Sequence, residues 1–333
     1  MGVGWAVVGC GDIAHKRVTP AIKSQAQSRL VAFHSRDRDR AEMFAREHGA
    51  EYGSQDLDRI LGDDRIAVVY VASEVDRHCE TAVAALNAGK HVLVEKPMAS
   101  DVLQCRTMVS SANAGGVHLS VAYYARFLEK SRVMKRVIQE GRLGKVVRAV
   151  VRNVSYYNPD TDDPKYWRVA GRGAGNCLAD VGSHRLDLLC YWLGRPTETV
   201  GLMDRLEMAY AACDTETVLA RFECGAHVLA MANSNVPHPG RFPTSMEVYG
   251  TEGSLLTDPW SAEPVTITGL DDQPIDISVP DNAHFPMIDN FATAISEGRR
   301  PEFDGTDGMW ATAIIASAYE SSETGHAVTI PEA

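Results

Sequence analysis

The chain has 333 residues, of which 45% are apolar and 23% charged, a composition typical of a folded globular protein. This length exceeds the usual size of a single compact core, so two domains are expected. The formal net charge is -11 and no dense Lys/Arg cluster offsets it, which argues against a nucleic-acid-binding protein.

The cysteines and the apolar runs indicate the compartment. The chain has seven cysteines, an odd number, and no two form a C-x-x-C pair, so neither a disulfide framework nor a thiolate zinc site is expected. A reducing, cytoplasmic environment fits this usage. Residues 1–9 lack the features of a signal peptide, and no apolar run is long enough to span a bilayer, so no membrane association is expected.

Short apolar runs alternate with helix-like stretches in the first third of the chain. This alternation is typical of βαβ units, which predicts an α/β fold with a parallel, doubly wound sheet over residues 1–122. The runs are residues 5–8, 30–33, 68–71, 91–94 and 117–121, and the helical stretches are 13–23, 38–48 and 80–87.

The pattern changes near residue 123. After a helix at 128–140, six longer β-type runs with short connections predict a largely antiparallel sheet in an α+β domain over residues 123–333, and the family resemblance given below implies that this sheet is open. The six runs are residues 146–156, 198–206, 216–222, 227–232, 245–249 and 265–268, and further helices are expected at 176–193, 287–297 and 306–324.

A glycine-rich turn follows the first predicted strand. Gly9, Gly11 and Ala14 make a G-x-G-x-x-A match that opens a predicted helix. In dinucleotide-binding proteins the first glycine permits a tight turn, and the second lets the backbone approach the pyrophosphate. The small third residue allows close helix–strand packing, and the helix N-terminus faces the phosphates. A plain strand–turn–helix connection is the alternative.

The second strand is expected to end at the residue that recognises the ribose of the cofactor. An acid there would accept hydrogen bonds from the hydroxyls of NAD, but Ser35 holds that place and Arg36 follows it. Because both side chains can donate to a 2′-phosphate, we expect NADP, with NAD as the alternative. Arg40 is a further candidate. The opposing interpretation is a solvated helix start, with these arginines neutralised by Asp37 and Asp39.

Lys96 follows the strand at 91–94, between Glu95 and Pro97. The loop after a parallel strand lies at the same sheet edge as the glycine turn, and ligands bind along that edge. A lysine there can hold a hydroxyl or carbonyl oxygen and can exchange a proton. An exposed lysine before a proline is the alternative.

Asp180, His184 and Asp187 are spaced at i, i+4 and i+7 of a predicted helix, so they share one helical face. An aspartate can orient the imidazole of a histidine one turn away and hold its pKa near neutrality, so the pair can relay a proton. A solvated polar stripe and a divalent-metal site are the alternatives.

Together these segments resemble the Gfo/Idh/MocA oxidoreductase family. The resemblance spans nearly the whole chain in the family's order and spacing. It rests on residues 7–14, 88–97, 166–168, 180–187 and 248–255. The Ser35–Arg36 pair resembles the NADP-preferring reductases of the family.

The resemblance implies an N-terminal Rossmann domain and a C-terminal domain that binds substrate and forms a homodimer or homotetramer through its sheet. It implies that Lys96 is the catalytic lysine and that His184, with Asp180, completes the acid–base set. The expected cofactor contacts are Gly9, Gly11, Asp12, Ile13, Ala14, Ser35, Arg36, Arg40, Ser73, His78, Glu95 and Lys96. The expected substrate contacts are Tyr123, Arg126, Trp167, Arg168, Asp180 and His184. No metal is expected.

One segment departs from the family. Ser73 and Glu74 stand in a turn where a Thr-Pro-Asn sequence is usual, although His78 is kept. Two tryptophans, Trp5 and Trp192, are expected in the core, and His284 is expected at the surface.

The resemblance implies an oxidoreductase that moves a hydride between NADP(H) and a CH–OH or C=O carbon of a sugar, a sugar derivative or a cyclic polyol. An NAD-dependent inositol or sugar dehydrogenase is the alternative within the class. Outside it, an NAD-using glycosidase, a non-catalytic dinucleotide sensor and a metal-dependent enzyme are the rivals.

Overall fold

The computed structural model describes residues 2–163, 165–171, 177–239, 244–261, 263–269, 275 and 277–332. The chain divides into two compact units. The first comprises the described residues of 1–124 together with 281–309, and the second those of 125–280 together with 310–333.

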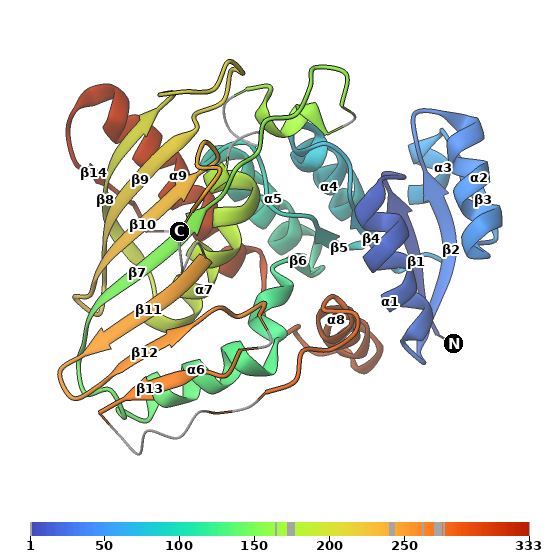
Figure 1. Cartoon of the computed structure of the whole chain (residues 1–333). Helices are drawn as coiled ribbons and strands as arrows, with labels where there is room; N and C mark the ends of the chain where they lie inside the picture. Colours follow the sequence, from blue (N-terminus) through green and yellow to red (C-terminus); the bar gives the residue numbers. More distant parts are fainter. Residues whose placement is uncertain are drawn as a thin grey trace. The chain divides into compact units, whose positions relative to one another are not determined.

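The first unit contains a six-stranded sheet in the order β3-β2-β1-β4-β5-β6, with every strand pair parallel (Figure 1). This confirms the predicted doubly wound sheet. All residues of β1 and β4 are buried, as expected for strands with both faces covered. The strands are β1 (Val3–Val8), β2 (Ser28–His34), β3 (Tyr52–Ser54), β4 (Val68–Val71), β5 (His91–Val94) and β6 (Leu119–Val121).

Helices connect these strands, and one of them comes from late in the sequence. Helix α8 packs on α1 and β1, where the Trp5 and Phe291 rings lie 6.0 Å apart, so a segment near residue 290 completes the first unit. Trp5 is fully buried, as predicted. The helices are α1 (Thr19–Ser24), α2 (Arg38–His48), α3 (Leu57–Leu61), α4 (His78–Asn87), α5 (Val102–Gly115) and α8 (Phe285–Glu297), with a π-helical segment at Ala14–Val18.

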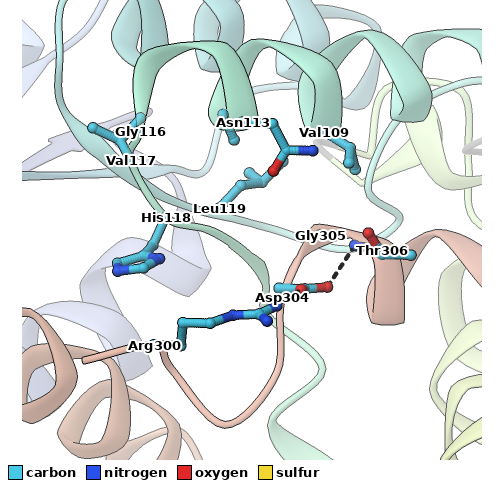
Figure 2. Close-up of a pocket in the computed structure, with 11 residues that line it drawn as sticks. Val109, Asn113, Gly116, Val117, His118, Leu119, Arg300, Asp304, Gly305 and Thr306 are labelled. Carbon is cyan, nitrogen blue, oxygen red and sulfur yellow. Dashed lines mark hydrogen bonds and ion pairs between the residues drawn. The ribbon is translucent and has the colours of Figure 1, made fainter.

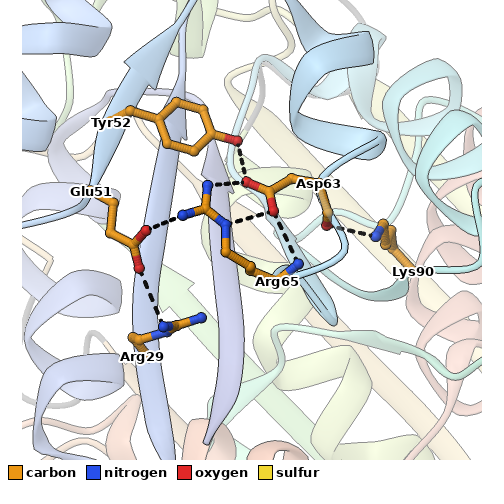
Figure 3. A network of polar contacts seen from close by, with 6 residues as sticks. All are labelled: Arg29, Glu51, Tyr52, Asp63, Arg65 and Lys90. Atoms are coloured by element: carbon orange, nitrogen blue, oxygen red, sulfur yellow. Dashed lines mark hydrogen bonds and ion pairs between the residues drawn. The ribbon is translucent and has the colours of Figure 1, made fainter. Parts of the chain in front are cut away.

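A polar network covers the amino-terminal edge of this sheet. Figure 3 shows the Arg65 guanidinium between the carboxylates of Glu51 and Asp63. Tyr52 also donates to Asp63, and Lys90 donates to the Asp63 backbone carbonyl. Hydrogen bonds from Arg65 hold the pKa of Asp63 well below its usual range. The network joins the segments before β3, β4 and β5, at the edge opposite the glycine turn.

The second unit contains an eight-stranded sheet in the order β13-β12-β11-β7-β10-β9-β8-β14. Among the described strands of this sheet, β7 and β10 pair in parallel and the other pairs are antiparallel, which confirms a largely antiparallel sheet. The strands are β7 (Val146–Val154), β8 (Pro196–Asp204), β9 (Thr215–Phe222), β10 (His227–Asn233), β11 (Thr244–Gly250), β12 (Ser254–Thr257), β13 (Thr266–Thr268) and β14 (Val328–Thr329).

One face of this sheet is covered by helices. Helix α9 approaches β8 so closely that a Cβ at Gly201 would lie 2.1 Å from the Ala318 carbonyl oxygen. The indole of Trp192 is buried, as predicted, and donates to the Ser131 carbonyl. The helices are α6 (Glu129–Gln139), α7 (Ser183–Leu193) and α9 (Gly305–Thr324), with a π-helical segment at Leu178–Gly182 before α7. The predicted helix start at Asn176, and the glycine-rich residues 172–175 before it, lie outside the described residues.

No helix in the described part of the chain is both long and apolar enough to cross a membrane.

Candidate active site

The turn after β1 has the backbone form that the glycine pattern predicts. Gly9 has a φ of 107°, and a Cβ there would lie 2.3 Å from the Ala72 carbonyl oxygen, so only glycine fits. A Cβ at Gly11 would meet nothing within 4 Å. Ala14 is fully buried beneath the turn, whereas Asp12 is exposed and pairs with Lys16. The backbone at Gly11 therefore faces open space, as a pyrophosphate cradle requires.

Ser35 and Arg36 follow β2 at the same edge of the sheet. The Ser35 hydroxyl accepts from the Asp37 amide at 3.2 Å, and the exposed Arg36 guanidinium donates to both carboxylate oxygens of Glu74 at 2.9 and 3.0 Å. Arg40 donates through Nε to the Cys10 carbonyl at 2.8 Å. Arg40 therefore braces the glycine turn, and Glu74 is a partner of Arg36 that the sequence patterns did not indicate.

His78 joins the turns that follow β4 and β5. Its ring nitrogens lie 3.0 Å from the Ser73 carbonyl oxygen and 3.0 Å from the Pro97 carbonyl oxygen. The ring is almost fully buried, and burial lowers its pKa. His78 therefore holds the turn of Ser73 against the turn of Lys96, which makes it a scaffold of the cofactor edge.

The backbone at Lys96 is supported by a buried hydrogen-bond network. The Glu95 carboxylate accepts from the Tyr70 hydroxyl at 2.7 Å and from the Lys96 backbone amide at 3.1 Å. Burial, followed by the Glu95 charge, raises the pKa of Tyr70 well above its usual value. The Lys96 side chain is half-buried, and its bond to Pro97 is cis. The buried Glu95 carboxylate thus holds the backbone amide of Lys96 in place.

His284 is buried, which corrects its expected surface placement. It caps the start of α8 in the first unit and stacks on Tyr124 with ring centroids 4.3 Å apart. Burial, then the charges of Arg17 and Lys96, lowers its pKa to about 4. Nδ1 has no hydrogen-bond partner among the described residues. His284 is therefore a neutral imidazole that is close enough to Lys96 for the lysine charge to affect its pKa.

Asp180 and His184 lie in the second unit on the helix predicted from their spacing. Asp180 belongs to the π-helical segment, and its carboxylate lies 3.5 Å from Nε of Arg168. His184 is in the first turn of α7 and buried, so the solvated-stripe alternative is wrong for it. Arg168 lies over the exposed ring of Trp167. Three of the predicted substrate contacts, Trp167, Arg168 and Asp180, are therefore neighbours.

A tryptophan that the sequence did not single out stands beside His184. The rings of His184 and Trp260 lie 6.0 Å apart, edge to face, and the Arg185 guanidinium lies over the same indole. The turn carrying Trp260 is held by the buried Lys130, whose ammonium donates to the carbonyls of Ser261 and Glu263 at 2.7 Å each. Trp260 thus packs against one side of the His184 ring.

Arg126 has a structural partner. Its guanidinium donates to both oxygens of Asp187 at 2.8 and 2.6 Å, and both side chains are buried. This pairing commits Asp187 to a cation, which counts against a metal ion shared by Asp180, His184 and Asp187. It also weakens the case for Arg126 as a substrate contact.

The buried acid Glu216 contacts the start of the π-helical segment that carries Asp180. Glu216 on β9 accepts from the Leu178 amide at 2.7 Å and from the Tyr319 hydroxyl at 2.9 Å. Burial raises its pKa to about 7. The Glu216 side chain thus anchors the π-helical segment that carries Asp180.

The first unit also contains a cavity of about 340 Å³. Figure 2 shows it beside α5, with His118 and Arg300 on one side and Asn113 on another. It opens where β6 begins, at the amino-terminal edge of the sheet. Asp304 already accepts from the first amides of α9. This cavity therefore lies at the edge opposite the glycine turn.

Comparison with known proteins identifies the class. The family model described as "Oxidoreductase family, NAD-binding Rossmann fold" matches residues 3–123, and the "GFO/IDH/MocA C-terminal domain" model matches residues 131–256. The chain belongs to the Gfo/Idh/MocA oxidoreductase family.

Particular relatives match along the whole chain. A 1,5-anhydro-D-fructose reductase from Ensifer adhaerens is 30% identical, over 98% of each chain. D-xylose 1-dehydrogenase (NADP(+)) 2 from Haloferax volcanii is 26% identical, over 98% of this chain and 99% of its own. A levoglucosan dehydrogenase solved with NADH and levoglucosan has a TM-score of 0.88 at 22% identity, over 100% of both chains.

We predict that Gly11→Val folds normally but loses dinucleotide binding. The new side chain enters open space, so the melting temperature should change little, while NADPH and NADH affinity should each fall at least about tenfold, or about 1.4 kcal/mol. Fluorescence titration of NAD(P)H measures binding. Gly9→Ala is the matched variant and should lower the melting temperature instead. Normal dinucleotide affinity in a folded Gly11→Val protein would contradict the cradle.

Proposed function

We propose that the protein transfers a hydride between NADP(H) and a CH–OH or C=O carbon of a sugar, a sugar derivative or a cyclic polyol. The observation that carries this proposal is the shared carboxyl edge of the first sheet. There the open backbone at Gly11 and the braced Lys96 lie on turns that follow parallel strands, where dinucleotide enzymes bind their cofactor. The contacts inherited from the family, Asp12, Ile13, Ser73 and Glu95, remain part of the proposed cofactor site.

The proposed chemistry assigns proton handling to Lys96 and His184. When bound, the nicotinamide supplies the hydride acceptor in oxidation and the donor in reduction. In oxidation, Lys96 or His184 takes the proton of the substrate hydroxyl as its C–H bond yields the hydride. In reduction, the same groups return a proton to the developing alkoxide. Asp180 orients His184, and Trp260 packs against one side of its ring.

We predict that Lys96→Met and His184→Asn each lower kcat by about 10²–10⁴-fold, because positioned acid–base groups contribute that much. NADPH affinity should change little. Stopped-flow turnover and fluorescence binding separate the two effects. Lys23→Met and His326→Asn change exposed side chains of the same types and should retain normal turnover. Near-normal kcat in both site variants would exclude the assigned roles.

The substrate class rests on the relatives and on the residues near Asp180. The relatives' names include an anhydrosugar reductase and a xylose dehydrogenase. The half-exposed ring of Trp167 offers an apolar face for sugar C–H bonds, and Arg168 offers donors for hydroxyl oxygens. Tyr123 remains a further proposed substrate contact. None of the seven cysteines, all of which lie in the described part of the chain, forms a disulfide, and a reducing, cytoplasmic location remains the proposed one.

The proposed preference for NADP depends on a competition at Arg36. Arg36 and Glu74 form an exposed ion pair, and such pairs contribute only about 0–1 kcal/mol. Charge-assisted hydrogen bonds to a phosphate contribute about 1.5–3 kcal/mol each. A 2′-phosphate can therefore displace Glu74 from Arg36, although the Glu74 charge reduces the gain.

We predict that Glu74→Gln strengthens NADPH binding and leaves NADH binding unchanged, because it removes the acid that competes for Arg36. Arg36→Ala should weaken NADPH binding about tenfold or more, and again spare NADH. Parallel NADPH and NADH titrations measure both effects. If neither substitution changes the ratio of the two affinities, Arg36 does not read the ribose and NAD becomes the favoured cofactor.

We also propose a homodimer or homotetramer formed through the eight-stranded sheet. An apolar row crosses the face of the sheet opposite α9: Val200 pairs with Leu219 on β9, which pairs with Leu229 on β10. Leu219 and Leu202 are 53% and 63% exposed, which is unusual for neighbouring leucines on one sheet face. Exposed apolar patches of this kind mark protein contacts.

We predict that Leu219→Lys dissociates the oligomer, since a charge would be buried in the contact. Light scattering after size-exclusion chromatography would then give the mass of one chain, near 36.3 kDa. Leu103→Lys, at a more exposed leucine on α5, is the control and should leave the mass unchanged. A monomeric wild-type protein would contradict the proposal directly.

A further inference from the structure

Three side chains of types that commonly bind metal ions lie close together in the first unit. His15 lies on the π-helical segment after the glycine turn, and Glu47 and His48 are the last two residues of α2. One ligand atom from each lies within 4.8 Å of the other two. We propose that His15, Glu47 and His48 bind one transition-metal ion with the preferences of Zn²⁺, using side chains that the proposed reaction does not use.

The distances are close to those that coordination requires. His15 Nδ1 lies 3.0 Å from His48 Nε2 and 3.5 Å from the Glu47 carboxylate. Ligand atoms about 2.05 Å from a tetrahedral zinc ion lie about 3.3 Å from one another. Two sides of the ligand triangle therefore need shifts of only a few tenths of an ångström. The third side can close because the half-exposed Glu47 side chain is free to change rotamer.

Packing already orients the two rings. The His48 ring lies 5.6 Å from both the Phe33 and Phe44 rings, and the His15 ring lies 6.1 Å from Phe44. An ordered pair of imidazoles loses little freedom when an ion binds. Each imidazole would bind the ion through an unprotonated ring nitrogen.

The chemistry of the ligand set selects the ion. Two imidazole nitrogens and one carboxylate oxygen suit Zn²⁺, Co²⁺ and Cu²⁺, whereas Mg²⁺ and Ca²⁺ prefer all-oxygen sites. Three protein ligands leave a fourth position for water. A bound ion would tie the segment after the glycine turn to the end of α2, and so would stabilise the first unit.

The test uses the full-length, tag-free chain, stripped with a chelator and desalted. We expect one equivalent of Zn²⁺ by calorimetry, a rise in melting temperature with Zn²⁺, and the visible absorption of a Co²⁺ complex. Exposed Cys224 is a competing ligand. Because the proposed site has no thiolate, the Co²⁺ spectrum should lack a near-ultraviolet thiolate charge-transfer band, and Cys224→Ser should change nothing.

Substitutions decide whether these residues are the ligands. His15→Gln and His48→Gln should each weaken Zn²⁺ binding at least about tenfold and abolish the thermal shift, and Glu47→Gln should weaken binding less. His326→Gln removes an exposed histidine elsewhere and should bind like the wild type. Glu47→Gln changes an exposed side chain, so it reports on the site even if a histidine variant misfolds. The absence of saturable micromolar binding, or equal binding by all variants, would show that His15 and His48 share only a hydrogen bond.

Discussion

The close approach of the turns after β1 and β4 is the constraint on which the proposed cofactor edge depends. Gly9 has no Cβ and a positive φ, so its backbone can lie against Ala72. His78 then links the turn after β4 to the turn after β5 through the Ser73 and Pro97 carbonyls. The turns after β1, β4 and β5 thus contact one another in sequence. The position of Lys96, in the turn after β5, depends on these contacts.

Neighbouring charges tune this edge more than the net charge of the chain does. The overall balance of -11 is unfavourable for a phosphate ligand, so local arginines must provide the attraction. However, Arg40 already donates one hydrogen bond to the Cys10 carbonyl, and Arg36 forms an ion pair with Glu74. The affinity of the proposed 2′-phosphate site would therefore depend on how readily Glu74, a residue of the turn after β4, releases Arg36.

The sequence predicted most of the fold because its buried strands and amphipathic helices have strong periodicity. The expected bounds of α2, β4 and β5 match those observed. Short elements such as β3, α3, β12 and β14 were not indicated, since segments of two to five residues show too little periodicity. The return of α8 to the first unit depends on packing against Trp5, which no local pattern reveals.

The same reasoning explains which candidate site residues the sequence could indicate. Gly9, Gly11 and the spacing of Asp180 and His184 carry information within one short segment. By contrast, Glu74, Trp260 and His284 matter through partners far along the chain: Arg36, His184 and Tyr124. Arg126 shows the reverse limit, because its residue type suggested a ligand contact, whereas its pairing with the buried Asp187 is not visible in the sequence.

In the second unit, buried polar groups anchor the π-helical segment and α7, which carry the proposed catalytic residues Asp180 and His184. Their effect on the orientation of this helix has a physical explanation. Glu216 accepts the Leu178 amide at the start of the π-helical segment, and Arg126 fixes Asp187 seven residues after Asp180. Breaking a buried ion pair costs about 3–5 kcal/mol, whereas an apolar replacement of both partners can be neutral. Such pairs therefore add less to stability than to a single orientation of the helix. A proton-transferring imidazole needs that fixed orientation, since its ring must reach a reacting oxygen within hydrogen-bond distance.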